Sequence, residues 1–286
     1  MFYQTQRAFT GSMTQTDVLE AARAVTEMVG RELEQLTPSG QNAVNYFAQV
    51  VAATPLIQNL PGTTPTRTYY LEDVFILTRQ NQTWTGIGYC VRTSDVNGRL
   101  WPAELTAGQA GIGSLYRFTM STNVLQNTGP NNGLPADPNV LFNAFRVACL
   151  PGSSAISNRI CDGVVHFQVR ASATNGFPIV SDGVTANAFF RGGATNLVYS
   201  VFRPASVSPK AAYPDKIEIC YSWGNAVPAY LEFEFGILES RALARYNSIT
   251  DPTARRNYFQ SEDLSTRVHL FRQRTAVRNA DPAAYQ

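Results

Sequence analysis

The chain has 286 residues, a formal net charge of +2 at pH 7 and 15% charged residues. This length can bury a sizeable core as one large domain or two small ones. The small net charge argues against nucleic acid as a partner, since nucleic-acid-binding proteins carry concentrated basic patches. The charged fraction lies below the roughly 25% usual for soluble domains, which favours an uncharged polar surface of the kind found on exported β-rich proteins.

The first 37 residues predict one long amphipathic helix. Apolar residues recur at spacings of three and four, which places them on one face of a helix. The pattern ends before Pro38, because a proline disfavours helical geometry in the residue preceding it. We expect the C-terminal half of this stripe to be core. Its members are Val18, Ala22, Val25, Val29, Leu33 and Leu36.

After residue 66 the sequence is dominated by strand and turn patterns, with β-branched and aromatic residues between Gly, Pro, Asn and Asp clusters. Residues 44–53 predict a short helix or an irregular segment, and residues 239–247 and 252–263 predict helices. The predicted strands are residues 69–78, 84–93, 115–120, 142–150, 163–173, 216–223, 229–238 and 266–278, with a loop at 126–139 and a long insertion with weak strands at 181–215.

These elements predict an α+β fold class, in which a long N-terminal helix packs on a largely antiparallel sheet. The expected organisation is a helix over residues 1–37 followed by a β-rich head over residues 38–286. The head would carry a helical insertion at about residues 239–263.

Four cysteines are present, and none has the spacing of a zinc site. Cys149 and Cys161 bracket a turn-rich stretch, so this pair is the first candidate for a disulfide. Cys90 and Cys220 lie in apolar strand patterns and are also consistent with buried thiols. We therefore predict no metal site and no cofactor.

The charged residues are unevenly distributed. Residues 14–37 are predominantly acidic, whereas residues 239–278 hold eight arginines and few acidic residues. Such segments either attract each other head to tail between subunits or form two solvated faces. The sequence leaves both interpretations open.

Catalytic motifs are lacking in the sequence. His166 and His269 are the only histidines, and neither belongs to a recognised metal or nucleophile motif. Glu232 and Glu234 alternate with phenylalanines and are expected to face solvent. We predict that the protein is not an enzyme.

Residues 15–36 (QTDVLEAARAVTEMVGRELEQL) resemble the helix that follows the membrane segment in prepilin-type proteins, and more narrowly in J-type minor pseudopilins of type II secretion. Residues 158–170 (NRICDGVVHFQVR) and 227–238 (VPAYLEFEFGIL) resemble strands of that family. Residues 267–285 (RVHLFRQRTAVRNADPAAY) resemble the closing strand of large pilin-like cassette proteins of Verrucomicrobia. These segments cover about a quarter of the chain, and the head is accordingly expected to be pilin-like.

The resemblance implies a non-catalytic structural subunit of a type II secretion or type IV pilus-like fibre. Its partners would be other pilin or pseudopilin subunits, and its location the periplasmic side of the inner membrane. A hydrophobic helix preceding this sequence would supply the membrane anchor. On the exposed side of the first helix, Phe2, Phe9 and Met13 are the expected subunit contacts.

Two other functions compete with this interpretation. The first is an extracytoplasmic carbohydrate- or substrate-binding module displayed on a fibre, with Trp84, Trp101 and Trp223 as an aromatic platform. The second is a hydrolase that uses one of the two histidines.

Overall fold

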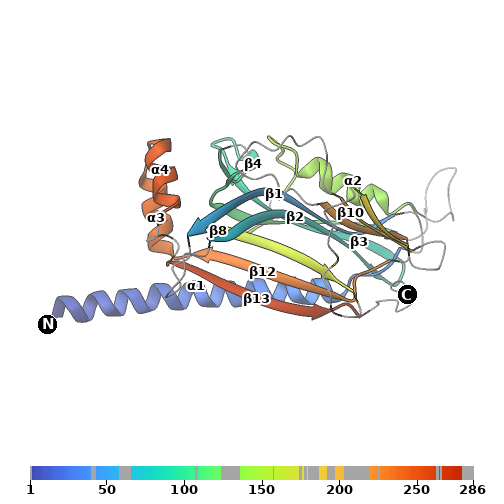
Figure 1. Ribbon diagram of the computed structural model, residues 1–286, viewed down its shortest axis with the longest axis horizontal. Coiled ribbons are helices and arrows are strands. Elements are labelled where there is room, and N and C mark those ends of the chain that lie inside the picture. Colours follow the sequence, from blue (N-terminus) through green and yellow to red (C-terminus); the bar gives the residue numbers. More distant parts are fainter. Residues whose placement is uncertain are drawn as a thin grey trace.

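The computed structural model is shown in Figure 1. It describes residues 2–39, 43–57, 66–106, 109–123, 136–156, 158–173, 176, 179, 187–191, 197–202, 219–224, 226–261, 264 and 266–278. Side chains are not described for residues 2–17, for β9 and β10, or for a few other strand positions.

Four helices and thirteen strands make up the described part of the chain. The helices are α1 (Phe2–Glu34), α2 (Asn139–Ala148), α3 (Ser240–Ser248) and α4 (Pro252–Phe259). The strands are β1 (Val44–Ile57), β2 (Thr66–Gln80), β3 (Thr83–Ser94), β4 (Leu100–Pro102), β5 (Glu104–Thr106), β6 (Gln109–Ala110), β7 (Gly113–Asn123), β8 (Asn158–Ser172), β9 (Asn187–Arg191), β10 (Leu197–Phe202), β11 (Ile219–Gly224), β12 (Tyr230–Leu238) and β13 (Val268–Ala276).

One 11-stranded sheet contains most of these strands, in the order β13-β12-β8-β7-β3-β2-β1-β11-β10-β9, with β4 paired to β3. β5 and β6 form a separate two-stranded sheet. Neighbouring strands along this order are antiparallel, and β2 makes one additional parallel pairing with β8, between Leu71 and Phe167. This last pairing completes a ring through β3 and β7.

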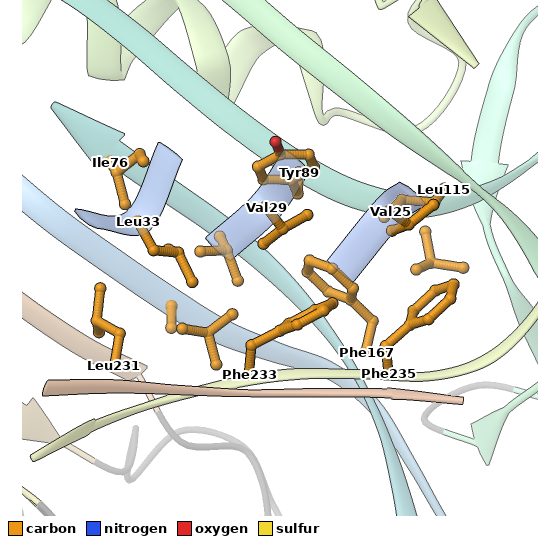
Figure 2. Packing of buried hydrophobic residues seen from close by; sticks show 14 of the residues in the cluster. Val25, Val29, Leu33, Ile76, Tyr89, Leu115, Phe167, Leu231, Phe233 and Phe235 are labelled. Carbon is orange, nitrogen blue, oxygen red and sulfur yellow. The ribbon is translucent and has the colours of Figure 1, made fainter. Parts of the chain in front are cut away.

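Side chains on both faces of the sheet are buried, because different elements cover each face. α1 covers one face, where Val25, Val29 and Leu33 point toward Phe167 and Phe233 (Figure 2). α2 covers a separate cluster on the opposite face, and α3 and α4 pack on a third cluster near the ends of β8 and β12. Double coverage explains why β8 is buried on both sides, although its sequence alternates between apolar and polar residues.

All six residues of the predicted helical stripe are buried, with Ala22, Val29, Leu33 and Leu36 fully so. The predicted strand at residues 84–93 is confirmed as β3, and the predicted helices at 239–247 and 252–263 are confirmed as α3 and α4. The part of the chain described by the structure contains no helix long and apolar enough to cross a bilayer.

The expected α+β, pilin-like fold class is wrong. Strands account for 51% of the structure and helices for 25%, so the protein is mainly β. The β2–β8 pairing closes the strands on themselves, whereas the prediction was a long N-terminal helix packed on a largely antiparallel, pilin-like sheet. Within α1, the side chains that are described as buried lie in a short segment, residues 18–34. This segment is one of several elements that pack on the closed β structure. The sequence could not show this, because an open and a closed sheet have the same alternation of residues.

Two local predictions are also wrong. Residues 44–53 belong to strand β1, which lies between β2 and β11 and obtains its hydrogen bonds from both. Residues 142–150 were expected to be a strand but lie mainly in helix α2, where Leu141, Phe145 and Ala148 are buried at helical spacing. Apolar runs this short do not separate helix from strand by periodicity, so tertiary contacts decide between them.

Two glycines of β3 make room for α2. The ring of Phe145 lies so close to Gly88 that a β-carbon there would be 2.3 Å from two ring carbons. A β-carbon on Gly86 would lie 2.9 Å from the β-carbon of Leu141. Gly86 and Gly88 therefore leave the space in which α2 packs directly against this face of the sheet.

Candidate functional site

The first helix continues beyond the sheet that covers its second half. Figure 1 shows the first turns of α1 extending past the edge of the strands, whereas the last turns run alongside β12 and β13. Phe2, Phe9 and Met13, the predicted subunit contacts, lie in the extending part of the helix. Their side chains lie outside the described residues.

Glu32 joins α1 to the middle of the sheet. Its carboxylate accepts hydrogen bonds from the Arg117 guanidinium, from Nη2 at 2.7 Å and from Nε at 3.1 Å, and another from the Tyr89 hydroxyl. The side chains of Arg117 and Glu32 are 24% and 16% exposed. Burial and the adjacent Glu32 carboxylate raise the pKa of Tyr89, so its hydroxyl remains a donor at neutral pH. A paired, hydrogen-bonded carboxylate in this position holds the helix at a defined register on the sheet.

The C-terminal end of α1 is held by further contacts with β2 and β13. The Thr37 N–H donates to the Leu77 carbonyl at 2.9 Å, and the Arg278 N–H donates to the Glu34 carbonyl at 3.2 Å. Gly30 lies against Gln273, where a β-carbon would come within 2.9 Å of the side-chain amide nitrogen. The second half of α1 is therefore held on the sheet by side-chain packing, an ion-pair network and backbone hydrogen bonds.

The arginine-rich C-terminal region finds many of its partners within the same chain. Arg278 pairs with Glu34 at 2.6 Å and Arg272 pairs with Glu232 at 2.5 Å. Arg274 lies over the ring of Tyr230, 4.4 Å from its centroid. The Arg278–Glu34 pair shows that part of the attraction between acidic and basic segments operates inside the subunit.

A buried ionisable cluster lies across β2, β8 and β12. The Nδ1 atom of His166 accepts the Tyr70 N–H at 2.9 Å, which leaves Nε2 to donate toward the Glu234 carboxylate at 3.3 Å. Glu234 also pairs with Arg67 at 2.9 Å and with Arg170 at 3.7 Å. Glu234 is buried, so the expectation that it faces solvent is wrong. Strand alternation alone missed it, because the second face of the sheet is also covered.

This cluster predicts that the protein loses stability in acid. Burial lowers the pKa of His166 in the folded protein, so the unfolded chain takes up this proton first as the pH falls below about 6.5. The hydrogen bond with His166 holds the pKa of Glu234 at about 2, so its stabilisation is present above the unfolded value of about 4.3 and is lost toward pH 2. Urea unfolding at pH 7, 5.5, 4 and 3 should show a free energy of unfolding that falls at each step.

The variant Glu234→Gln tests the assignment of this acid sensitivity. This variant should reduce the pH dependence of the free energy of unfolding below pH 4.5. Glu232→Gln, two residues away on the same strand, is the control, because it removes a charge outside the buried contact with His166. Equal pH profiles for Glu234→Gln and the parent would contradict the assignment.

The two histidines, which the hydrolase hypothesis would use, have different surroundings. His166 is 1% exposed and its two ring nitrogens are engaged by Tyr70 and Glu234. His269 pairs with Glu239 at 3.2 Å. Asp162, the nearby carboxylate in sequence, binds Ser114 and Arg159. The arrangement supports a structural role for His166, since its neutral ring donates a hydrogen bond that orients the buried Glu234 carboxylate, while Arg67 and Arg170 supply the positive charge.

Trp84 does not contribute to the predicted aromatic platform. Trp84 is 1% exposed and packs in the α2-side cluster, beneath the guanidinium of Arg79. Trp101 is 44% exposed, and the side chain of Trp223 lies outside the described residues. The buried Trp84 removes one of the three members on which the binding-module hypothesis depended.

The predicted Cys149–Cys161 disulfide is not formed. Both thiols are free, and the two residues pack in clusters on opposite faces of the sheet. Cys149 lies beside Cys90 and Asp73 instead, within a group whose side-chain sulfur and oxygen atoms are all within 4.8 Å of one another. Proximity along the sequence was misleading, because Cys149 ends α2 whereas Cys161 lies in β8 on the other side of a turn.

No protein-family model, curated protein or solved structure matches the chain.

Proposed function

We propose that the protein is a non-catalytic structural subunit, of the minor pseudopilin type, in a type II secretion or type IV pilus-like fibre. One observation carries the proposal: the second half of α1 is held firmly on the β body, while the first half extends past its edge (Figure 1). A helix presented in this way offers its surface to neighbouring subunits. The resemblance of residues 15–36 to the prepilin-type helix supports the same role.

The proposed mechanism is packing, with no chemical step. Association costs free energy when flexible segments must become ordered, so a helix already held at a defined register pays less on assembly. The Glu32–Arg117–Tyr89 network and the buried stripe supply this preorganisation. The extending turns, with Phe2, Phe9 and Met13, then contribute apolar area to contacts between subunits.

On the strength of the same resemblance, we place the protein in the cell envelope at the inner membrane. Its proposed partners are other pilin-like or pseudopilin subunits. A position near the fibre tip is expected of the J-type minor pseudopilins that residues 15–36 resemble.

The contact surface can be tested with the triple variant Phe2→Ser, Phe9→Ser, Met13→Ser, expressed in the native host in place of the parent gene. If these side chains pack between subunits, incorporation into sheared, purified fibres should fall at least tenfold, since three apolar contacts are lost together. Quantitative immunoblotting of the fibre fraction measures this loss. The free energy of unfolding of the purified head should stay close to that of the parent.

Val96→Ser provides the matched control, because Val96 is a fully exposed apolar residue in the turn after β3. It should assemble like the parent. Normal incorporation of the triple variant would exclude the three residues as contacts, and absence of the parent chain from the fibre fraction would refute the proposed function.

A further inference from the structure

Two cysteines far apart in sequence meet where α2 packs on the sheet. Cys90 lies in β3 and is fully buried, whereas Cys149 follows the last residue of α2 and is half-buried. Their sulfur atoms lie within 4.8 Å of each other and of a carboxylate oxygen of Asp73. The two thiols are close enough to share a hydrogen bond. Cys161 and Cys220 pack in the α1-side cluster instead.

The structure holds these two cysteines opposite each other through several independent contacts. Arg92, two residues beyond Cys90, donates from Nη2 to the Cys149 carbonyl at 3.2 Å and to Asp73 Oδ2 at 2.6 Å. The Cys149 N–H donates to the Phe145 carbonyl at 2.9 Å. Phe145 itself packs against β3 at Gly88. The end of α2 therefore cannot slide along β3 without breaking an ion-pair network and a close ring contact.

We propose that Cys90 and Cys149 form a disulfide that joins α2 to the sheet when the protein meets a disulfide oxidant. The Cys149 thiolate attacks one sulfur of an external disulfide, RSSR, and releases the first RS⁻. The Cys90 thiolate then attacks the Cys149 sulfur of the mixed disulfide and releases the second RS⁻. One disulfide bond is broken in the oxidant and one is formed in the protein, and the two protons from the cysteines end on two RSH molecules. Cys149 is the entry point because it is the more exposed of the two.

The charges around the pair favour a disulfide over a metal ion. Asp73 and Arg92 already neutralise each other, and both thiols are uncharged when protonated. A disulfide leaves that balance unchanged. A divalent ion bound to the same sulfur atoms would require both thiols to lose their protons, and it would compete for the Asp73 carboxylate with the Arg92 guanidinium, which already holds it at 2.6 Å. The buried Asp73 Oδ1 has no hydrogen-bond partner, which is the one feature that a metal ion would explain better.

The surroundings also predict how the reaction depends on pH. The hydrogen bond with Cys90 and burial raise the pKa of Cys149, so its thiolate is scarce at neutral pH. Oxidation of the folded protein should therefore be slow at pH 7 and should accelerate at pH 8.5. Oxidation during refolding, before the thiols are buried, should be faster than either.

The test is to refold the purified protein with oxidised and reduced glutathione, without added metal. Free thiols are then counted in denaturant and disulfides are mapped by non-reducing peptide mass spectrometry. The thiol count should fall by two, with the Cys90 peptide linked to the Cys149 peptide. Closing a loop of about 60 residues should raise the melting temperature by about 5–10 °C, and reductant should reverse this gain.

Cys149→Ser, at the half-buried position, should abolish the linkage while the protein still folds, and Cys161→Ser should leave it intact as the matched control. Four free thiols after refolding, or a linkage through Cys161 or Cys220, would overturn the proposal. Stoichiometric zinc that protects both thiols of the reduced protein, when Zn²⁺ is added separately, would overturn it in favour of a metal site. These outcomes do not depend on fibre assembly, so the disulfide and the proposed function can fail separately.

Discussion

Replacing Gly88 with alanine is expected to lower the free energy of unfolding by about 3 kcal/mol. The added β-carbon would lie 2.3 Å from two carbons of the Phe145 ring, well inside van der Waals contact. The ring cannot move away easily, because it also packs against Phe75 and Phe118. Either α2 lifts from the sheet or β3 shifts, and both loosen the cluster that α2 covers. Urea denaturation followed by circular dichroism measures the loss.

A double-mutant cycle with Phe145→Leu identifies the cause. Phe145→Leu alone should also destabilise the protein, since it removes part of a fully buried ring. The two changes together should cost at least 1 kcal/mol less than the sum of the single changes, because the smaller side chain gives room to the new methyl group. Additive effects would show that Gly88 is needed for a reason other than its contact with Phe145.

Replacing Glu32 with alanine is expected to cost about 2–3 kcal/mol and to loosen the second half of α1 on the sheet. The change leaves the half-buried Arg117 guanidinium and the buried Tyr89 hydroxyl without their shared acceptor. Breaking one side of such a network costs more than the pair itself contributes, because the remaining charge stays buried. Urea denaturation gives the global loss, and hydrogen exchange at α1 amides should increase more than exchange in β12.

Glu27→Ala provides a matched control on the same helix. Glu27 pairs with Arg31, but both side chains are more than 60% exposed, so the loss should stay below about 0.5 kcal/mol. Equal costs for Glu32→Ala and Glu27→Ala would mean that the helix is held by its apolar stripe alone. The Glu32–Arg117–Tyr89 network would then not contribute to the proposed preorganisation of α1 for contacts with other subunits.

Local patterns were sufficient where one physical constraint dominated. The stripe from Val18 to Leu36 is read from spacing alone, because a helix buried on one side must repeat its apolar residues every three to four positions. Strand β3 and helices α3 and α4 were likewise predicted close to their observed bounds. Helix α4 begins where Asp251 caps the Ala254 N–H and Pro252 follows, a signal contained entirely in neighbouring residues.

Local patterns failed where contacts with distant elements decide the conformation. The conformations of β1 and α2 depend on their partners: β2 and β11 supply hydrogen bonds to β1, and the glycines of β3 leave space for α2. Closure of the sheet through Leu71 and Phe167 depends on a single pairing between residues 96 positions apart. The predicted fold class failed at this point, because alternation within one strand carries no information about which strand lies beside it.

The sequence by itself determined that the first segment is an amphipathic helix and that strands dominate the rest of the described residues, because backbone geometry imposes periods that residue types must follow. It also contained the resemblance on which the proposed function draws. Only the tertiary structure decided which side chains meet: Glu32 with Arg117, His166 with Glu234, and Cys90 with Cys149. These pairs come from elements that are distant in sequence, and they lie buried or half-buried between packed layers that only the folded chain creates. Periodicity is a local property of the chain, whereas pairing and burial are properties of the folded whole.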